Sequence, residues 1–267
     1  MSDSLAKSPI PPLLVPEDPP AVCVINGDGA APAVLICDHG SPDVPLALRD
    51  LGLDQAARAR HIAWDIGVAA VGRALSAKLD AALVLPGFSR LVIDLNRDPE
   101  DPTAICVISD RTIVPGNRNL AAADRAARIA ELFQPYHAAV AERIDAHIVQ
   151  GRRPMLISLH SFTPVIAGWG HERQERPWHI GVLFDRDERL ARPLLAALRA
   201  RGDLVVGENQ PYSARNGHGF SLAHHGESRG LRHVELEIRQ DLIADRAGAE
   251  RFAGILAEAL TPLLNAA

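Results

Sequence analysis

The chain has 267 residues, of which 47% are hydrophobic and 23% are charged, and its formal net charge is −5 at pH 7. This is the composition of a globular protein that can bury one sizeable core. The negative balance argues against a nucleic-acid-binding surface, and the absence of any run of 18 apolar residues argues against a membrane span.

The N-terminal sequence and the cysteines indicate a cytoplasmic protein. The first twenty residues lack the charged segment followed by an apolar segment that marks a secretory signal. The three cysteines, Cys23, Cys37 and Cys106, form no CxxC spacing and are typical of reduced core residues. A zinc site built on thiolates is therefore not expected.

Proline dominates the start of the chain. Six prolines fall within residues 1–20, and such a segment favours an extended backbone over a helix or an interior strand. We expect residues 1–20 to form an arm and residues 21–267 to form a single domain.

Apolar segments with strand and helix periodicity alternate along that domain. The predicted strands are residues 21–25, 33–37, 82–85, 91–95, 155–159, 180–184, 204–206 and 233–238. The predicted helices are residues 67–79, 120–150 with a break or kink at Pro135, 188–201 and 249–264. This alternation predicts an α/β domain whose mostly parallel sheet is covered on both faces.

Polar residues with catalytic potential follow several of these strands. Asp38 and His39 come after strand 33–37, Asn96 and Arg97 after strand 91–95, and His160 after strand 155–159. Strand 233–238 carries Glu235 and Glu237, whose side chains share one face because strand residues alternate. Since ligands of open α/β sheets bind at the carboxyl ends of the strands, we expect these groups to meet at one site.

Two histidines and a carboxylate are the ligand set of a catalytic zinc with an open position for water. The alternative for each histidine is a hydrogen-bonded structural role, and the alternative for Asp94 is a salt bridge with Arg97 or Arg111. His225 could contact substrate or be structural, whereas His137 and His147 are expected at the surface. A Cys37–His39 nucleophile pair is disfavoured because no glycine turn of the oxyanion type surrounds the cysteine.

Six segments in their order along the chain resemble the N-formylglutamate amidohydrolase family. They are CDHGSPDVP, HIAWDIGV, RLVIDLNR, LHSFTP, NQPYS and HHGESRGLRHVELEIRQDLI, and they lie between about Ala33 and Ile243. This family is related to zinc carboxypeptidases and aspartoacylases. The resemblance implies a three-layer α/β/α sandwich with a mixed, mostly parallel sheet of the phosphorylase/hydrolase type.

The resemblance also implies roles for individual residues. Zn²⁺ or another divalent metal would be held by His39, His160 and a third ligand. The related enzymes place a glutamate three residues after the first histidine, where this chain has Pro42. Asp43 and Asp65 are the remaining candidates, and we prefer Asp65 because its segment belongs to the resemblance.

The other implied roles concern substrate and proton transfer. Glu237 would be the general base, and Arg90, Asn96 and Arg97 would bind a substrate carboxylate, with Arg90 also counted among the catalytic residues. Tyr212 and His225 lie in matching segments and are expected to bind substrate.

The sequence therefore predicts a zinc-dependent amidohydrolase that cleaves the amide bond of a small N-acyl amino acid, with N-formyl-L-glutamate as the best candidate. The alternatives are the same chemistry on another N-acyl amino acid or small peptide, and a metal-free protein that only binds carboxylates. Neither a nucleic acid nor a membrane is expected as a partner, and the oligomeric state stays open.

Overall fold

A seven-stranded mixed sheet forms the centre of the molecule. The computed structural model describes residues 12–167, 173–216 and 219–265, and the strand order in this sheet is β1-β3-β2-β6-β11-β9-β10. Its strands are β1 (Val22–Ile25), β2 (Ala33–Ile36), β3 (Ala82–Pro86), β6 (Met155–Phe162), β9 (Ile180–Leu183), β10 (Val206–Glu208) and β11 (His233–Arg239). Two hairpins lie outside it, β4 (Ile108–Ser109) with β5 (Thr112–Ile113), and β7 (Val165–Ala167) with β8 (Arg173–Glu175).

Most neighbouring strands run parallel, as predicted. The β3–β2, β2–β6, β6–β11 and β9–β10 pairs are parallel, and only β1–β3 and β11–β9 are antiparallel. Every residue of β2, β3, β6 and β9 is buried, which explains why these segments read as continuous apolar runs.

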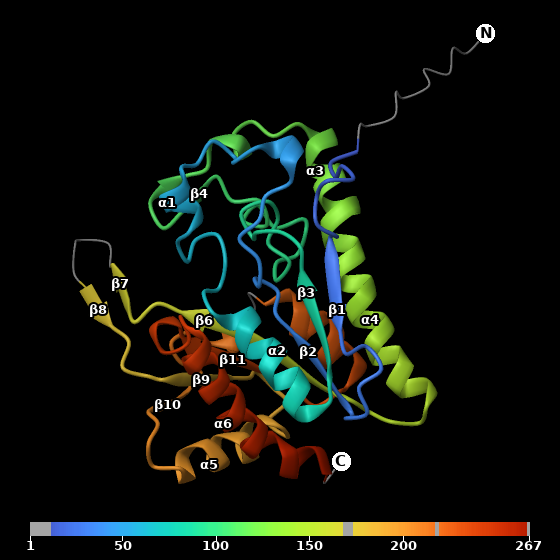
Figure 1. Cartoon of the computed structure of the whole chain (residues 1–267), viewed down its shortest axis with the longest axis vertical. Coiled ribbons are helices and arrows are strands. Elements are labelled where there is room, and N and C mark those ends of the chain that lie inside the picture. The colour runs from blue at the N-terminus through green and yellow to red at the C-terminus, as the bar shows by residue number, and fades with distance from the viewer. Residues whose placement is uncertain (1–11, 168–172, 217–218, 266–267) are drawn as a thin grey trace.

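Helices cover both faces of the sheet, so the predicted three-layer sandwich is confirmed (Figure 1). Helices α2 (Val68–Leu79), α5 (Ala191–Ala200) and α6 (Arg246–Asn265) pack on one face, and α4 (Gln134–Val149) packs on the other. The remaining helical segments are η1 (Leu46–Leu48), α1 (Gln55–Arg58), η2 (Pro115–Asn117), α3 (Ala122–Arg128), η3 (Ile129–Phe133), η4 (Ala214–Asn216), η5 (Leu222–Gly226), η6 (Glu227–Arg229) and η7 (Gln240–Leu242).

The long helical segment predicted around Pro135 contains a π-helical turn. This turn, η3, joins α3 to α4, and Pro135 lies in the first turn of α4, where its missing N–H costs no helix hydrogen bond. The expectation that His137 and His147 lie at the surface is wrong: both are buried, on the face of α4 that packs against the sheet and its neighbouring loops.

The strand predicted at residues 91–95 is also wrong, because this segment forms consecutive turns. Its apolar side chains are buried in the core on the α4 side of the sheet. Two of its carbonyl groups have side-chain partners in place of a neighbouring strand, since Asn117 Nδ2 donates to Leu91 O and Arg128 Nη1 to Val92 O, each at 2.8 Å. Burial alone therefore produced the apolar pattern that resembled a strand.

The described part of the proline-rich arm is held against the domain. The backbone N–H groups of Leu13 and Leu14 donate to the two carboxylate oxygens of Glu131, at 2.8 and 3.0 Å, and Leu13 is buried. Residues 1–11 lie outside the described residues. Within the described ranges, no helix is long and apolar enough to cross a membrane.

Candidate active site

Three adjacent parallel strands bring the predicted groups together towards the carboxyl ends of the central strands. His39 follows β2, His160 lies within β6, and Glu235 and Glu237 lie within β11. Because β6 is paired with both β2 and β11, His160 lies between the other groups, and it is the direct register partner of Glu237. His160 was expected just after its strand, but β6 continues to Phe162.

His39, Asp65 and His160 form a compact buried cluster. One potential ligand atom from each residue lies within 4.8 Å of the others. Asp65 Oδ2 is 2.9 Å from His160 Nδ1 and 3.5 Å from His39 Nδ1. Asp43 is exposed and does not belong to this cluster, so the geometry favours Asp65 as the third ligand.

The donor atoms of this cluster suit a divalent metal. His39 Nδ1 is buried and has no hydrogen-bond partner among the described residues, whereas its Nε2 lies 2.8 Å from Asp94 Oδ1. A proton on Nε2 would leave the lone pair of Nδ1 facing Asp65. Two imidazole nitrogens and one carboxylate oxygen form an N₂O set that Zn²⁺ accepts, with a coordination position left for water or substrate.

The carboxylates around the two imidazoles make the cluster attractive to cations. Burial lowers the pKa of His39, but the negative charges of Asp94 and Asp65 outweigh it and raise that pKa. Burial likewise opposes protonation of His160, yet its hydrogen bonds to Asp38 and Asp65 raise its pKa well above the ordinary value. The site therefore favours positive charge at the position between the histidines and Asp65.

Asp94 connects the cluster to Arg90. Its Oδ2 accepts hydrogen bonds from Arg90 Nε and Nη2, at 3.1 and 2.6 Å, while its Oδ1 faces His39. The alternative for Asp94, a salt bridge with an arginine, is therefore realised with Arg90 and not with Arg97 or Arg111. Arg90 Nη1 lies 3.7 Å from Asp65 Oδ1, so most of this guanidinium is engaged by protein carboxylates.

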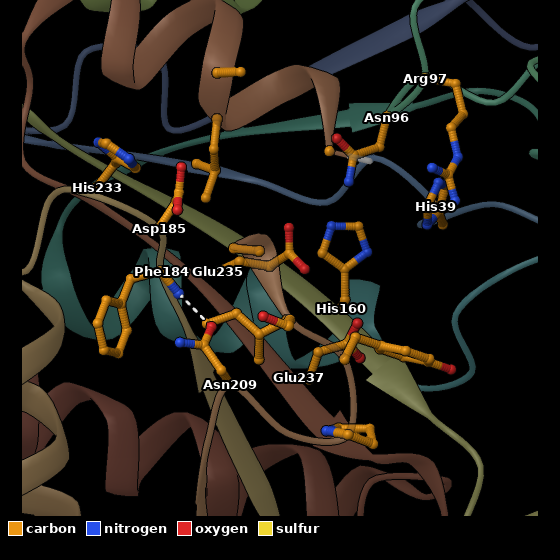
Figure 2. A pocket seen from close by; sticks show the side chains of 18 of the residues that line it. His39, Asn96, Arg97, His160, Phe184, Asp185, Asn209, His233, Glu235 and Glu237 are labelled. Carbon is orange, nitrogen blue, oxygen red and sulfur yellow. Dashed lines mark hydrogen bonds between the residues drawn. The ribbon is translucent and has the colours of Figure 1, made fainter. Parts of the chain in front are cut away.

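A cavity of about 770 Å³ opens beside the cluster. Figure 2 shows His160, Glu235 and Glu237 turned into this cavity, with Asn96 and Arg97 contributed by the turns after residue 95. The predicted site residues that line it are His39, Asp65, Arg90, Asn96, Arg97, His160, Tyr212 and Glu237.

Glu237 is a buried carboxylate beside the cavity. Only 5% of its surface is exposed, and its Oε2 has no hydrogen-bond partner in the part of the chain that the structure describes. Burial raises its pKa well above the usual glutamate value. Burial also raises the pKa of Glu235, which lies on the same face of β11.

A family model for N-formylglutamate amidohydrolases matches residues 31–244 of the chain. The chain belongs to the N-formylglutamate amidohydrolase family. It is accordingly a hydrolase that acts on carbon–nitrogen amide bonds. No curated protein sequence matches it significantly.

Two solved structures share the fold of this amidohydrolase over nearly their full length. The gene product Atu2144 from Agrobacterium tumefaciens is 38% identical, with a TM-score of 0.90 over 95% of this chain and 98% of that one. The N-formylglutamate amidohydrolase from Ralstonia eutropha JMP134 is 23% identical, with a TM-score of 0.72 over 92% and 97% of the two chains.

The cavity-lining residues that were expected to bind substrate are held in different ways. Asn96 Oδ1 accepts a hydrogen bond of 2.9 Å from Ser221 N, which leaves the amide NH₂ group as its donor. Tyr212 lies at the rim with 45% of its surface exposed, and its hydroxyl accepts a hydrogen bond of 3.0 Å from the buried Arg176. Arg176 also stacks over the Tyr212 ring at 4.8 Å, a contact that no sequence pattern indicated.

The structure places His225 outside the cavity, contrary to the expectation that it binds substrate. Its ring is buried and its Nε2 lies 2.9 Å from His137 Nδ1, while His137 Nε2 lies 2.9 Å from Leu95 O. The two histidines therefore support the turn that carries Asn96.

Proposed function

We propose that this protein is a zinc-dependent amidohydrolase that cleaves N-formyl-L-glutamate, or a closely related N-acyl amino acid, to the free acid and the amino acid. The observation that carries this proposal is the convergence of His39, Asp65 and His160 beside Glu237 in one cavity of a family member. Zn²⁺ bound by these three residues would polarise the acyl oxygen and lower the pKa of a bound water.

Glu237 is the proposed proton carrier. Its buried carboxylate, with a raised pKa, can accept a proton from the attacking water and deliver it to the nitrogen of the leaving amino acid. Such a transfer needs a group that is unprotonated before attack, so the positive charge of a bound metal would help to keep Glu237 ionised.

Arginine and asparagine side chains would orient the substrate. Arg97 and Asn96 line the cavity and can bind the carboxylate of the amino acid, for which a planar guanidinium is well suited. Arg90 is committed to Asp94 through two of its nitrogens, so its remaining Nη1 is suited to the acyl oxygen at the reacting end.

The test is the release of formate and glutamate from N-formyl-L-glutamate by the purified protein, measured after chelation and after readdition of Zn²⁺. Chelation should abolish activity and Zn²⁺ should restore it. The Glu237→Gln variant should bind Zn²⁺ normally but lose about 100- to 10,000-fold in kcat, the usual contribution of a general acid–base residue. A protein that binds the compound without metal and without turnover would instead be the carboxylate-binding alternative.

Other N-formyl and N-acetyl amino acids, and small N-acyl peptides, should be assayed in parallel. If the kcat/KM for one of these compounds exceeded that for N-formyl-L-glutamate, that compound would be the preferred substrate, and the proposed chemistry would be unchanged.

A further inference from the structure

Asp38 is a completely buried carboxylate directly before His39. Its Oδ1 accepts hydrogen bonds from Tyr136 OH and Ser221 Oγ, both at 2.8 Å. These two donors come from α4 and from the segment before η5, so residues 98 and 183 positions away are brought to one oxygen. Two fixed donors on one oxygen hold the carboxylate in a single orientation.

The second oxygen of Asp38 faces His160. Asp38 Oδ2 lies 3.4 Å from His160 Nε2, and Ser158 Oγ lies 3.0 Å from the same nitrogen. Both ring nitrogens of His160 face a carboxylate, and the neutral ring has one proton for the two of them. When Nε2 carries that proton, the opposite nitrogen presents its lone pair. In His160 that opposite nitrogen is Nδ1, which lies 2.9 Å from Asp65.

We propose that Asp38 is a positioning residue that keeps the proton of His160 on Nε2 and thereby turns the lone pair of Nδ1 towards the metal position beside Asp65. The inference rests on the proposed metal site and adds to it the group that selects the tautomer of its second histidine. Outer partners of this kind fix ring orientation and increase the basicity of metal-binding histidines.

Ser221 connects Asp38 to Asn96, which lines the cavity. Its hydroxyl donates to Asp38, while its backbone N–H donates to Asn96 Oδ1 at 2.9 Å. One buried residue therefore orients both the carboxylate behind His160 and the amide proposed to bind substrate. The Ser221→Ala variant removes only the first of these bonds, so it separates the two effects.

The Asp38→Asn variant tests the proposal. Because Tyr136 and Ser221 both donate, they will hold the asparagine oxygen and turn its NH₂ group towards His160 Nε2. A donor at that position selects the tautomer with the proton on Nδ1, which blocks metal binding. We expect Zn²⁺ affinity, measured by competition with a chromophoric chelator, to fall by about 10- to 100-fold, with KM for N-formyl-L-glutamate little changed.

Tyr136→Phe is the matched control, since it removes one hydrogen bond to Asp38 but leaves the carboxylate facing His160. Its Zn²⁺ affinity should change much less than that of Asp38→Asn, and Ser221→Ala should behave in the same way. If folded Asp38→Asn binds Zn²⁺ as tightly as the unchanged protein, Asp38 only satisfies the hydroxyl groups of the core and the proposal is overturned.

A second measurement does not depend on metal or on the folding of the variant. Long-range ¹H–¹⁵N spectra of the metal-free, unchanged protein, at a pH where the ring is neutral, show which nitrogen of His160 carries the proton. A proton on Nε2 supports the proposal and a proton on Nδ1 overturns it. If the unchanged protein takes up no Zn²⁺, the proposed function fails, and these spectra still decide the role of Asp38.

Discussion

Asp94 Oδ1 lies 2.8 Å from His39 Nε2, so a buried carboxylate stands directly behind the first histidine of the cluster. Burial opposes ionisation of Asp94, but Arg90 and His39 hold its pKa well below the ordinary value. The Asp94 carboxylate is thereby kept in its charged form, and it can keep the Nδ1 lone pair of His39 directed at the metal position.

We predict that Asp94→Asn weakens Zn²⁺ binding by about 10- to 100-fold, because His39 loses the partner that fixes its orientation. It should also reduce kcat, since Arg90 loses its main anchor. Chelator competition measures the first effect and steady-state kinetics the second. Asp98→Asn is the matched control from the same segment, because Asp98 is exposed, and it should change neither quantity.

The third metal ligand is tested by comparing two aspartates. Asp65→Asn removes a carboxylate that lies within 3.5 Å of both histidines and should weaken Zn²⁺ binding more than the loss of an outer partner such as Asp94 does. Asp43→Asn changes an exposed side chain and should leave the metal content unchanged. Elemental analysis of the two purified variants would contradict our assignment if their order were reversed.

Arg97 should matter only for substrates that carry a carboxylate. A charge-assisted hydrogen bond contributes roughly 1.5–3 kcal/mol, so Arg97→Met should lower kcat/KM for N-formyl-L-glutamate by about 10- to 150-fold. The α-amide of the same compound should be a poor substrate that the variant cleaves as well as the unchanged enzyme does. Lysine at position 97 should rescue only part of the loss.

An equal loss on both substrates would show that Arg97 is structural. Arg246→Met provides the control for removing an exposed arginine elsewhere, at the start of α6, and it should affect neither substrate.

The His137–His225 pair makes the protein sensitive to acid. Burial lowers the pKa of His137 to about 4 and that of His225 to about 3. Since His137 Nε2 donates to Leu95 O, its Nδ1 must accept from His225 Nε2, and the buried His225 Nδ1 has no acceptor for an added proton within the described ranges. Both rings are therefore neutral in the folded protein.

The unfolded chain binds protons at these histidines below about pH 6.5, whereas the folded chain does not do so until about pH 4. Their contribution to stability is thus complete above pH 6.5 and is lost as the pH falls. At pH 5 each histidine costs about 2 kcal/mol of unfolding free energy. His39 and His160, whose pKa values are raised, act in the opposite direction in the metal-free protein.

The pair is isolated by comparing the unchanged protein with His225→Gln, whose amide can still donate to His137. In urea titrations, the free energy of unfolding falls between pH 8 and pH 5 in both proteins. The fall should be about 2 kcal/mol smaller in the variant than in the unchanged protein, because the variant lacks one of the two titrating histidines. Its stability at pH 8 measures the cost of the substitution itself. If the free energy of unfolding fell equally with pH in both proteins, His225 would not be a source of the acid sensitivity.

The sequence predicted the helices and strands whose apolar residues follow a helix or strand periodicity. The prediction failed where an apolar segment is buried without forming either element. The apolar segment at residues 91–95 has the composition of a strand, but two of its carbonyl groups are bound by Asn117 and Arg128, which no local pattern reveals. His39, His160 and Glu237 could be predicted because they follow or belong to strands that meet at one edge of the sheet. Even so, Asn96 and Arg97 reach the cavity from turns.

The supporting network could not be predicted, because its members are distant in the chain. Asp38, Tyr136 and Ser221 meet only after α4 and the segment before η5 have packed on the sheet. The same applies to Arg176 and Tyr212. The charged helical pattern also gave the wrong location for His137 and His147, because the sequence does not show which polar residues of a helix are buried.

Alternation along β11 makes the site intolerant of changes in chain length. Glu235 and Glu237 face the cavity, while Leu236 and Ile238 enter the core on the other face. If one residue were removed from the turn before His233, β11 could shift its register by one position. Both carboxylates would then point into the hydrophobic core, and Leu236 would face the cavity. The number of residues between Gly230 and Arg239 is therefore fixed by the need to keep both carboxylates on the cavity face of β11.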